Sequence, residues 1–166
     1  TTLNRFAEGT VEVFGGVVEP AGDFADGPLG EALFNEPAAL ALDSKGNLYV
    51  SDAGNQRIRY IDFAAGTVTT VAGGGELAND ALYVEGDLRD GPALEARFYS
   101  PKGIALDSEG GLYIADSINH SIRYLKDGKV LTVAGGPNGE NGAVNGTEKR
   151  ALFDYPTDVA VGRDGS

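Results

Sequence analysis

The sequence predicts an all-β fold built from copies of one unit, and three observations carry this prediction. The stretch at 37–52 returns at 101–116, and a third copy begins at Pro156. Each copy consists of short apolar runs separated by turn residues, which is typical of strands. Glycine makes up 25 of the 166 residues, about twice the usual ~7%, and it falls after the apolar runs, where turns are needed. Such a unit cannot bury its own faces, so its copies must stack.

One full repeat predicts four strands, which lie at 38–43, 48–51, 57–62 and 67–72. The first is almost entirely apolar, as expected of a strand buried on both faces. The last two alternate polar and apolar residues and therefore have one wet face. The turn between the first two strands contains Gly46, which is free to adopt a positive φ. Burial therefore falls from the first strand to the fourth, which is the order expected from the inner to the outer strand of a propeller blade.

The repeats are joined by linkers that also recur, at 26–34, 90–98 and 145–153. Each begins with Asp or Asn followed by Gly and continues into a short helix-favouring stretch. This pattern predicts a capped single turn. The Leu or Ala and the Phe of each linker are expected to pack inward.

The repeated residues resemble the NHL repeat, whose pattern runs from Pro-x-Gly through Asp-x-x-Gly-x-Leu-Tyr to Asp-x-x-Asn-x-x-Ile-Arg. The first copy matches this pattern at Pro37, Asp43, Gly46, Leu48, Tyr49, Asp52, Asn55, Arg57 and Ile58. The second copy matches it at Pro101, Gly103, Asp107, Gly110, Leu112, Tyr113, Asp116, Asn119, His120 and Ile122. Departures occur at Ala39, where Gly is usual, at Ser121, in the position of Arg57, and at Gly162, in place of the turn-opening Asp.

The resemblance implies a β-propeller, usually of six blades, of which this chain forms one domain at 1–166. Complete four-stranded blades are expected at 34–74 and 98–136, with outer strands of a preceding blade at 1–16 and the inner strand of a following blade at 153–166. Half a propeller leaves blade edges open. A homo-oligomer joined through these edges is one expectation, and a piece of a longer propeller is the other. The linkers resemble those of bacterial surface NHL proteins, which favours an extracellular or cell-surface location.

Composition excludes several classes of partner and chemistry. Thirteen basic against 25 acidic residues give a net charge of −12, and a field of this sign repels phosphate backbones, so no nucleic acid is expected. The absence of Cys excludes disulfides and thiolate chemistry. No apolar run reaches the ~18 residues of a membrane span, so none is expected.

Polar residues that recur in both copies are candidates for a ligand-binding face. Asp43 and Asp107 open equivalent turns, where a carboxylate accepts backbone N–H bonds, so their expected role is structural. Two other residues follow the second strand of each copy: Asp52 and Asn55 in the first, and Asp116 and Asn119 in the second. They either line one face of the ring and accept a ligand donor or tie down the following loop. Their repetition in every blade favours the second interpretation.

The linker at 75–97 is the sharpest feature that does not repeat. Its carboxylates are weak candidates for Ca²⁺ ligands: Asp80, Glu85, Asp87 and Asp90. The stretch lacks the Asp-x-Asp-x-Asp-Gly spacing of a specific Ca²⁺ loop, so a solvated acidic loop is the favoured interpretation. Tyr83 and Tyr99 could form an aromatic edge for a sugar or peptide, or pack against the neighbouring turn.

No catalytic residue is predicted. His120 is the only His, whereas metal-dependent NHL-fold enzymes such as the amidating lyase need several, so it is expected in an ordinary loop. The expected function is a non-catalytic scaffold without a cofactor, which binds a protein, peptide or carbohydrate through the linkers at 16–36, 74–100 and 136–155. The alternative is a portion of a metal-dependent lyase or hydrolase whose catalytic residues lie in other blades.

Overall fold

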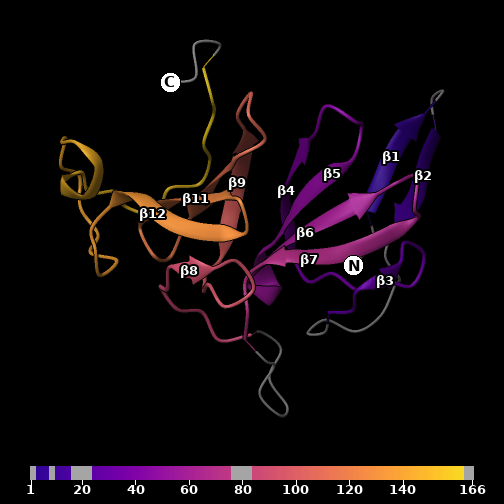
Figure 1. Ribbon diagram of the computed structural model, residues 1–166, viewed down its shortest axis with the longest axis horizontal. Coiled ribbons are helices and arrows are strands. Elements are labelled where there is room, and N and C mark those ends of the chain that lie inside the picture. The colour runs from indigo at the N-terminus through magenta and orange to yellow at the C-terminus, as the bar shows by residue number, and fades with distance from the viewer. Residues whose placement is uncertain (1–2, 8–9, 16–23, 76–83, 163–166) are drawn as a thin grey trace.

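A computed structural model describes residues 3–7, 10–15, 24–75 and 84–162, and these contain no α-helix. The strands are β1 (Leu3–Ala7), β2 (Thr10–Gly15), β3 (Gly27–Pro28), β4 (Pro37–Leu42), β5 (Leu48–Asp52), β6 (Arg57–Asp62), β7 (Thr67–Ala72), β8 (Gly91–Pro92), β9 (Pro101–Leu106), β10 (Leu112–Asp116), β11 (Ser121–Lys126) and β12 (Lys129–Gly135). β1 and β2 pair as an antiparallel hairpin. The other ten strands form two antiparallel sheets (Figure 1).

The two sheets have the same order and register. Blade 1 runs β3-β7-β6-β5-β4, and blade 2 runs β8-β12-β11-β10-β9. Leu40 pairs with Val50 in blade 1, and Ile104 pairs with Ile114 at the equivalent place in blade 2. The four long strands of blade 1 lie within one residue of their predicted positions. The predicted alternation of apolar runs and turns therefore produces the same sheet twice.

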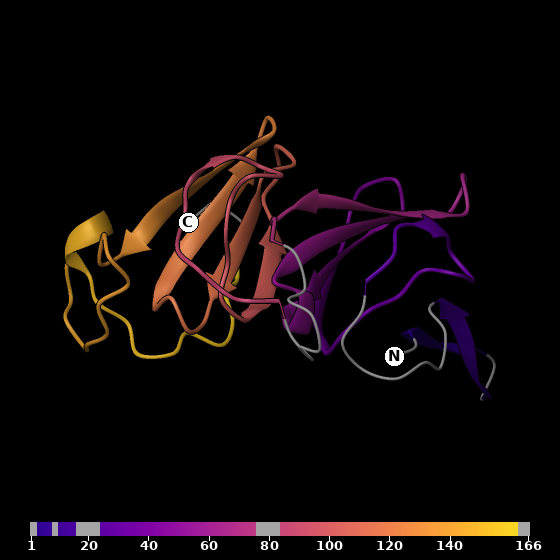
Figure 2. The same ribbon diagram turned by 90° about the horizontal axis from the view of Figure 1, so that it is seen from below.

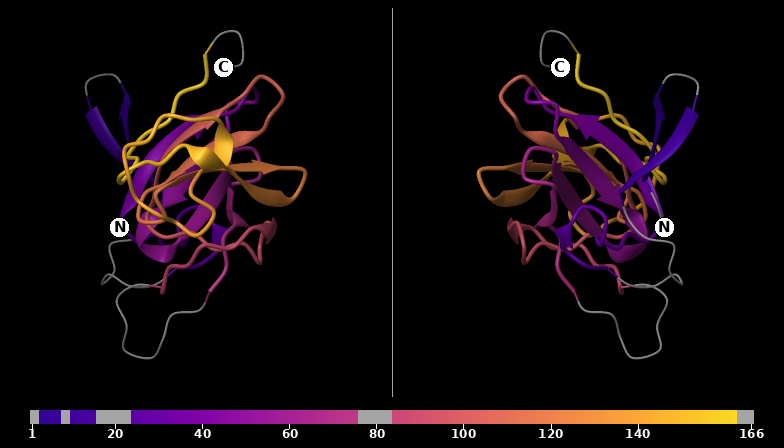
Figure 3. Two further views of the ribbon diagram at one scale, coloured as in Figure 1. Left: turned by 90° about the vertical axis from the view of Figure 1, so that its left-hand side faces the viewer. Right: turned by 90° about the vertical axis from the view of Figure 1, so that its right-hand side faces the viewer.

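The blades stack through one shared apolar core. Ile58 and Ala72 of blade 1 pack with Ile104, Ile114 and Leu125 of blade 2. The inner strands β4 and β9 lie side by side, as Figures 1 and 2 show, and the two sheets overlap when seen from either end (Figure 3). The arrangement is a partial, open β-propeller, in which each blade shields its neighbour from water.

The linkers form the predicted single turns, since the carbonyl oxygens of Pro28 and Pro92 each accept the amides three and four residues further on. Asp90, expected to cap such a turn, binds Arg123 and Thr132 instead, and the linkers also give each blade a fifth strand. β3 pairs with the start of β7, and β8 pairs with the start of β12, so each linker joins the outer edge of the blade that follows it. Ala96 and Phe98 are buried in the core between the blades, as expected of the inward-packing residues. The linker thus packs between two blades, because its short strand pairs with the following blade and its Ala96 and Phe98 lie in the shared core. A two-residue strand is too short to produce a periodic sequence signal.

The inner strand of blade 1 is not buried on both faces, contrary to the prediction. Leu40 is 49% exposed and Leu42 is 65% exposed, whereas Ile104, at the position equivalent to Leu40, is only 6% exposed. Ile104 is covered by blade 1, and no blade of the described residues covers the outward face of β4. Burial of an inner strand therefore depends on its neighbouring blade rather than on its own sequence.

The third copy of the repeat forms no strand over its described residues 156–162. It nevertheless lies against blade 2, because Thr157 accepts a hydrogen bond from the Gly103 amide at 3.1 Å. Asp158 packs so closely on Gly103 that a Cβ there would lie 2.1 Å from the Asp158 carboxylate. Position 103 therefore has to be glycine, whereas Ala39 occupies the equivalent position in blade 1.

Candidate functional site

The predicted turn aspartates have the expected structural role and one further partner each. The Asp43 carboxylate accepts the amides of Lys45 and Asn47, both at 2.8 Å. Its second oxygen accepts the hydroxyl of Tyr60 at 2.9 Å, on the third strand of the blade. Asp107 repeats this arrangement in blade 2 with the Tyr124 hydroxyl, which is the main cause that lowers the pKa of Asp107. These carboxylates brace the turns that they open, and both also line a cavity of about 430 Å³ between the two turns.

The aspartates at the ends of β5 and β10 are buried and hydrogen-bonded to the adjoining loops, which agrees with the favoured interpretation that they tie down a loop and not with a place on a ligand-binding face. In blade 2, one oxygen of Asp116 accepts the Tyr99 amide at 2.7 Å. The other accepts Asn119 Nδ2 at 2.8 Å and Arg123 Nη1 at 2.6 Å. Desolvation outweighs these partners and raises the pKa of Asp116 to about 6, so the carboxylate is ionised at pH 7. Asp52 makes the same contacts to the Asn35 amide, Asn55 and Arg59.

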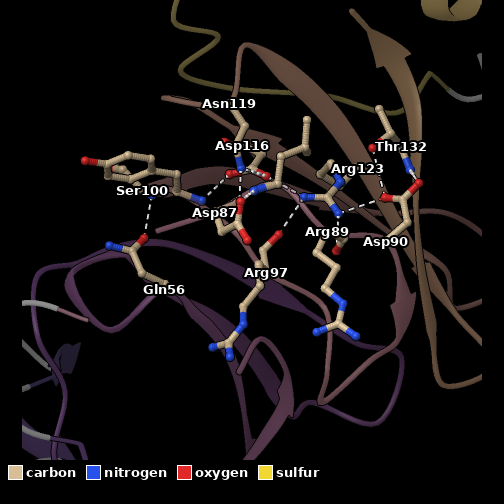
Figure 4. Close-up of polar contacts among 12 residues, drawn as sticks. Gln56, Asp87, Arg89, Asp90, Arg97, Ser100, Asp116, Asn119, Arg123 and Thr132 are labelled. Atoms are coloured by element: carbon tan, nitrogen blue, oxygen red, sulfur yellow. Dashed lines mark hydrogen bonds and ion pairs between the residues drawn. The ribbon is translucent and has the colours of Figure 1, made fainter. Parts of the chain in front are cut away.

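Arg123 and Arg59, the arginines at the centres of the two networks, were not among the candidate residues predicted from the sequence. Arg123 also donates to the carbonyl oxygens of Arg97 and Arg89 at 2.8 and 2.9 Å and to Asp90 Oδ1 at 2.8 Å (Figure 4). The second Asp90 oxygen accepts the Thr132 amide at 3.0 Å. Arg123 therefore fixes the linker to the blade at three points. A β-bulge between Ile122 and Arg123 places this side chain.

Blade 1 contains the same anchor. Arg59 is fully buried and donates to Asp52, Asp26 and the carbonyl oxygens of Ala25 and Leu33. The signal in the sequence was the Arg two residues after the start of the third strand in both copies, together with the Asp that opens each linker. Because the partners lie 26 to 34 residues away in the chain, spacing alone does not connect them.

A second repeated contact joins one blade to the next. Gln56 and His120 adopt left-handed backbone conformations at equivalent positions, with φ of 54° and 49°. Gln56 Oε1 accepts the Ser100 amide at 2.5 Å, and His120 Nδ1 accepts the Tyr155 amide at 3.1 Å. His120 is buried and packs edge-on against the Tyr155 ring. It is therefore a structural residue that connects blade 2 to the third copy.

Two adjoining cavities of about 380 and 370 Å³ lie where the linker crosses between the blades. They share Glu85 and Gly86, and together they form the feature that we call the inter-blade groove. One cavity is also lined by Gly75, Asp87 and Arg97, and the other by residues that include Gln56, Tyr99 and Ser100. Gly86 lies flat on the Tyr99 ring, and Tyr99 is 40% exposed.

The predicted site residues divide into four groups. Asp52, Asn55, Asp116, Asn119 and His120 are buried within the blades. Tyr99, Glu85 and Asp87 lie at the inter-blade groove, whereas Asp90 is bound to Arg123 and Thr132. Tyr83 and Asp80 fall outside the described residues. Within the described part of the chain, no three acidic or His side chains converge in a manner that could hold a metal ion.

Comparison with known proteins places the chain in a family. The NHL repeat model matches residues 34–59 and 98–125, the inner strands of both blades together with the anchoring arginines. This chain is an NHL-repeat protein. Human NHL repeat-containing protein 2 is 30% identical over 139 residues, which is 80% of this chain and 18% of that protein. The rat peptidylglycine alpha-amidating monooxygenase is 29% identical over 86% of this chain and 15% of its own length.

The solved structures agree on the fold of these NHL blades. A structural genomics protein of unknown function from Bacteroides thetaiotaomicron superposes with a TM-score of 0.71 at 25% identity. The match covers 96% of this chain and 36% of that one. The chain also spans about a tenth to a fifth of the length of the curated relatives that it matches first.

Proposed function

We propose that this NHL-repeat chain is a non-catalytic binding scaffold and that its ligand occupies the inter-blade groove. The observation that carries the proposal is the groove itself. Its walls come from both blades and the linker, and Arg123, Gln56 and Asp116 hold that linker in place. The groove is thus largely preformed, which is typical of small-ligand sites. Its lining combines charged and polar residues, among them Glu85, Asp87 and Arg97, with the apolar side chains of Val84, Tyr99 and Ile118, so a short carbohydrate or peptide is the expected class of ligand.

The test is an amide NMR titration of the 166-residue chain with short oligosaccharides and peptides. A ligand of the groove should shift the amides of Gly54, Glu85, Gly86 and Tyr99 and leave the far turn at Gly128 unchanged. Tyr99→Ala, which removes the exposed ring, should weaken binding by about tenfold, as aromatic contact residues often do. Shifts spread over the turns at the opposite end, or no shifts with any ligand class, would contradict the proposal.

We also propose that two copies associate through the open face of blade 1. Leu40 and Leu42 on this face are the counterparts of residues that the neighbouring blade covers in blade 2. Light scattering after size exclusion should give a mass near twice 17.2 kDa, and Leu42→Lys should return it to the monomer. A monomer at ~10⁻⁴ M for the unaltered chain would refute self-association and leave the face to other blades of a longer chain.

One observation favours a different function. The similarity to the rat monooxygenase is consistent with a metal-dependent enzyme whose catalytic residues lie in blades outside this chain. Metal analysis and a lyase or hydrolase assay on the parent protein separate the two possibilities. A stoichiometric transition metal with turnover would replace the scaffold function, whereas ligand binding in the groove of a metal-free protein would support it.

The expected location is extracellular or on a bacterial cell surface, a proposal supported by the type of linker. The described residues include no helix that is long and apolar enough to cross a lipid bilayer. When source cells are fractionated, the protein should be found in the secreted fraction or in the fraction washed off the cell surface. Recovery from the cytoplasm alone would refute it.

A further inference from the structure

Two arginines occur side by side in the linker of blade 2. Arg89 and Arg97 form an isolated antiparallel bridge, so their side chains lie on the same side of it. Both extend away from the Asp116 network toward blade 1 (Figure 4). The equivalent bridges of the other linkers are Ala25 with Leu33 and Val144 with Leu152. The fold therefore accepts small or apolar residues at these positions and does not require the arginines.

The Arg97 guanidinium is held against the backbone at the mouth of the groove. A Cβ on Gly75 would lie 2.2 Å from Arg97 Nη1, so glycine at 75, with a φ of +108°, leaves room for it. Arg57 approaches Gly75 as well, and it donates to the carbonyl oxygens of Gly75 and Asn55 at 2.5 and 2.8 Å. By contrast, neither Arg97 nor Arg89 has a side-chain hydrogen bond or ion pair among the described residues. Two such arginines, without a hydrogen-bonded partner in the described part of a chain of net charge −12, are available to bind an anionic group.

The remaining walls of the groove narrow the class of ligand. Glu85 and Asp87 place exposed carboxylates beside Arg97 in the cavity of about 380 Å³. Carboxylates accept hydrogen bonds from hydroxyl groups, and they repel a ligand that carries negative charge but no hydroxyl groups. Tyr99 offers a partly exposed ring, a surface on which an apolar ring face stacks. A single ligand unit that suits all three features has one carboxylate, several hydroxyls and a flat apolar face.

We propose that the inter-blade groove binds the uronic acid unit of a short acidic saccharide, with its carboxylate on Arg97 and within reach of Arg89, which lines neither cavity but adjoins the groove through its bridge to Arg97. A planar guanidinium binds a carboxylate with two parallel hydrogen bonds. The sugar hydroxyls donate to Glu85 and Asp87. This inference rests on the proposed function and names the substrate class of the same site. The overall negative charge favours a short saccharide, because a long polyanion would be repelled by the rest of the surface.

The experiment titrates the 166-residue chain with trigalacturonate, its methyl ester and succinate, followed by calorimetry and amide NMR. The ester keeps the rings and hydroxyls and removes the charge, and succinate keeps the charge and removes the rings. Trigalacturonate should bind at least tenfold more tightly than either, and binding should weaken with added salt. Equal binding of acid and ester would overturn the inference but leave the scaffold function intact. Equal binding of succinate at the same amides would overturn the sugar and leave a general carboxylate site.

The matched variants are Arg97→Leu and Arg150→Leu, each of which removes one positive charge from the chain. Leucine is the residue at position 33, the equivalent of 97 in the first linker, so Arg97→Leu should fold normally. It should lose at least tenfold in affinity for trigalacturonate, and Arg150→Leu should change it less than twofold. Arg89→Ala, with the residue of position 25, should weaken binding by a smaller factor. Equal losses in Arg97→Leu and Arg150→Leu would show that only net charge matters and would refute the site.

Discussion

Replacing Arg123 with Met tests whether the buried arginine holds the linker to the blade. Methionine has a similar length and is apolar, so it fills the space without making any of the four contacts to Asp116, Asp90 and the carbonyl oxygens of Arg97 and Arg89. Asp116 would then be a buried carboxylate without a cation. Removing one partner of a buried ion pair typically costs about 3–5 kcal/mol. That is a large part of the ~5–15 kcal/mol that stabilises a small domain.

The measurement is urea unfolding followed by circular dichroism at pH 7. Lys126→Met is the matched control, since Lys126 lies on the same strand and pairs with the exposed Glu109 at the surface. An exposed pair contributes about 0.2–1 kcal/mol, so this variant should change little. If Arg123→Met is too unstable to measure, Arg123→Lys, which keeps the charge but not the fork, should fold with a smaller loss. Similar small losses for Arg123→Met and Lys126→Met would refute the role of the network.

Two further predictions concern the loop end and the turn end of the blades. Gly54→Ala would place a Cβ 2.6 Å from Asn35 Cγ and 2.9 Å from the Asn35 carbonyl oxygen, and both distances are too short for van der Waals contact. Thermal unfolding should therefore show a free energy of unfolding that is lower by about 1–3 kcal/mol. Tyr124→Phe removes the main cause that lowers the pKa of Asp107, so carboxyl NMR should show this pKa rising toward 3.8. Because the folded pKa is below the unfolded value, the stability from Asp107 is present at neutral pH and is lost as the pH falls through the folded pKa. The variant should therefore lose less stability on acidification.

Each of these predictions has a control within the chain. Gly30→Ala meets no atom within 4 Å and needs no positive φ, so it should be neutral or slightly stabilising. A loss equal to that of Gly54→Ala would contradict the steric explanation. Tyr113→Phe removes a neighbouring hydroxyl that is not among the donors to Asp107. A shift of the Asp107 pKa in this variant, and none in Tyr124→Phe, would contradict the assigned cause.

The local structure was predictable from the sequence because it depends on residues close together in the chain. Alternation and turn glycines placed the long strands, and Asp43 accepts amides from residues only two and four positions away. Contacts between distant segments were not predictable in this way. Asp52 and Asp116 were assigned a loop-binding or ligand role, but the arginine that each contacts lies on the next strand and reaches into a linker that spacing does not locate. Leu40 shows the same limit, because its exposure is decided by the absence of a covering blade among the described residues.

The residues of the groove likewise divide into those that could be predicted from the sequence and those that could not. Tyr99 was a candidate from its residue type, and the structure places it at the groove. Arg89 and Arg97 gave no specific signal, because two arginines in an acidic linker are typical of ordinary surface charges. Their distinction lies in the bridge that joins them and in the apolar residues at the equivalent bridges, and both require the alignment of three linkers in space. Residues that recur at equivalent positions determine the fold, whereas residues that depart from the repeat are expected to determine individual binding properties.

The pairing of β3 with β7 and of β8 with β12 determines which segment can be exchanged as a unit. The linkers at 26–34 and 90–98 are each hydrogen-bonded and ion-paired to the blade after them, so a recombination point placed directly before an inner strand would separate Asp90 from Arg123. A cassette from residue 84 to residue 136 keeps those partners together and carries its own groove wall with it. Grafting such cassettes between propellers would transfer ligand preference along with the blade, whereas grafting 98–136 would transfer only a sheet.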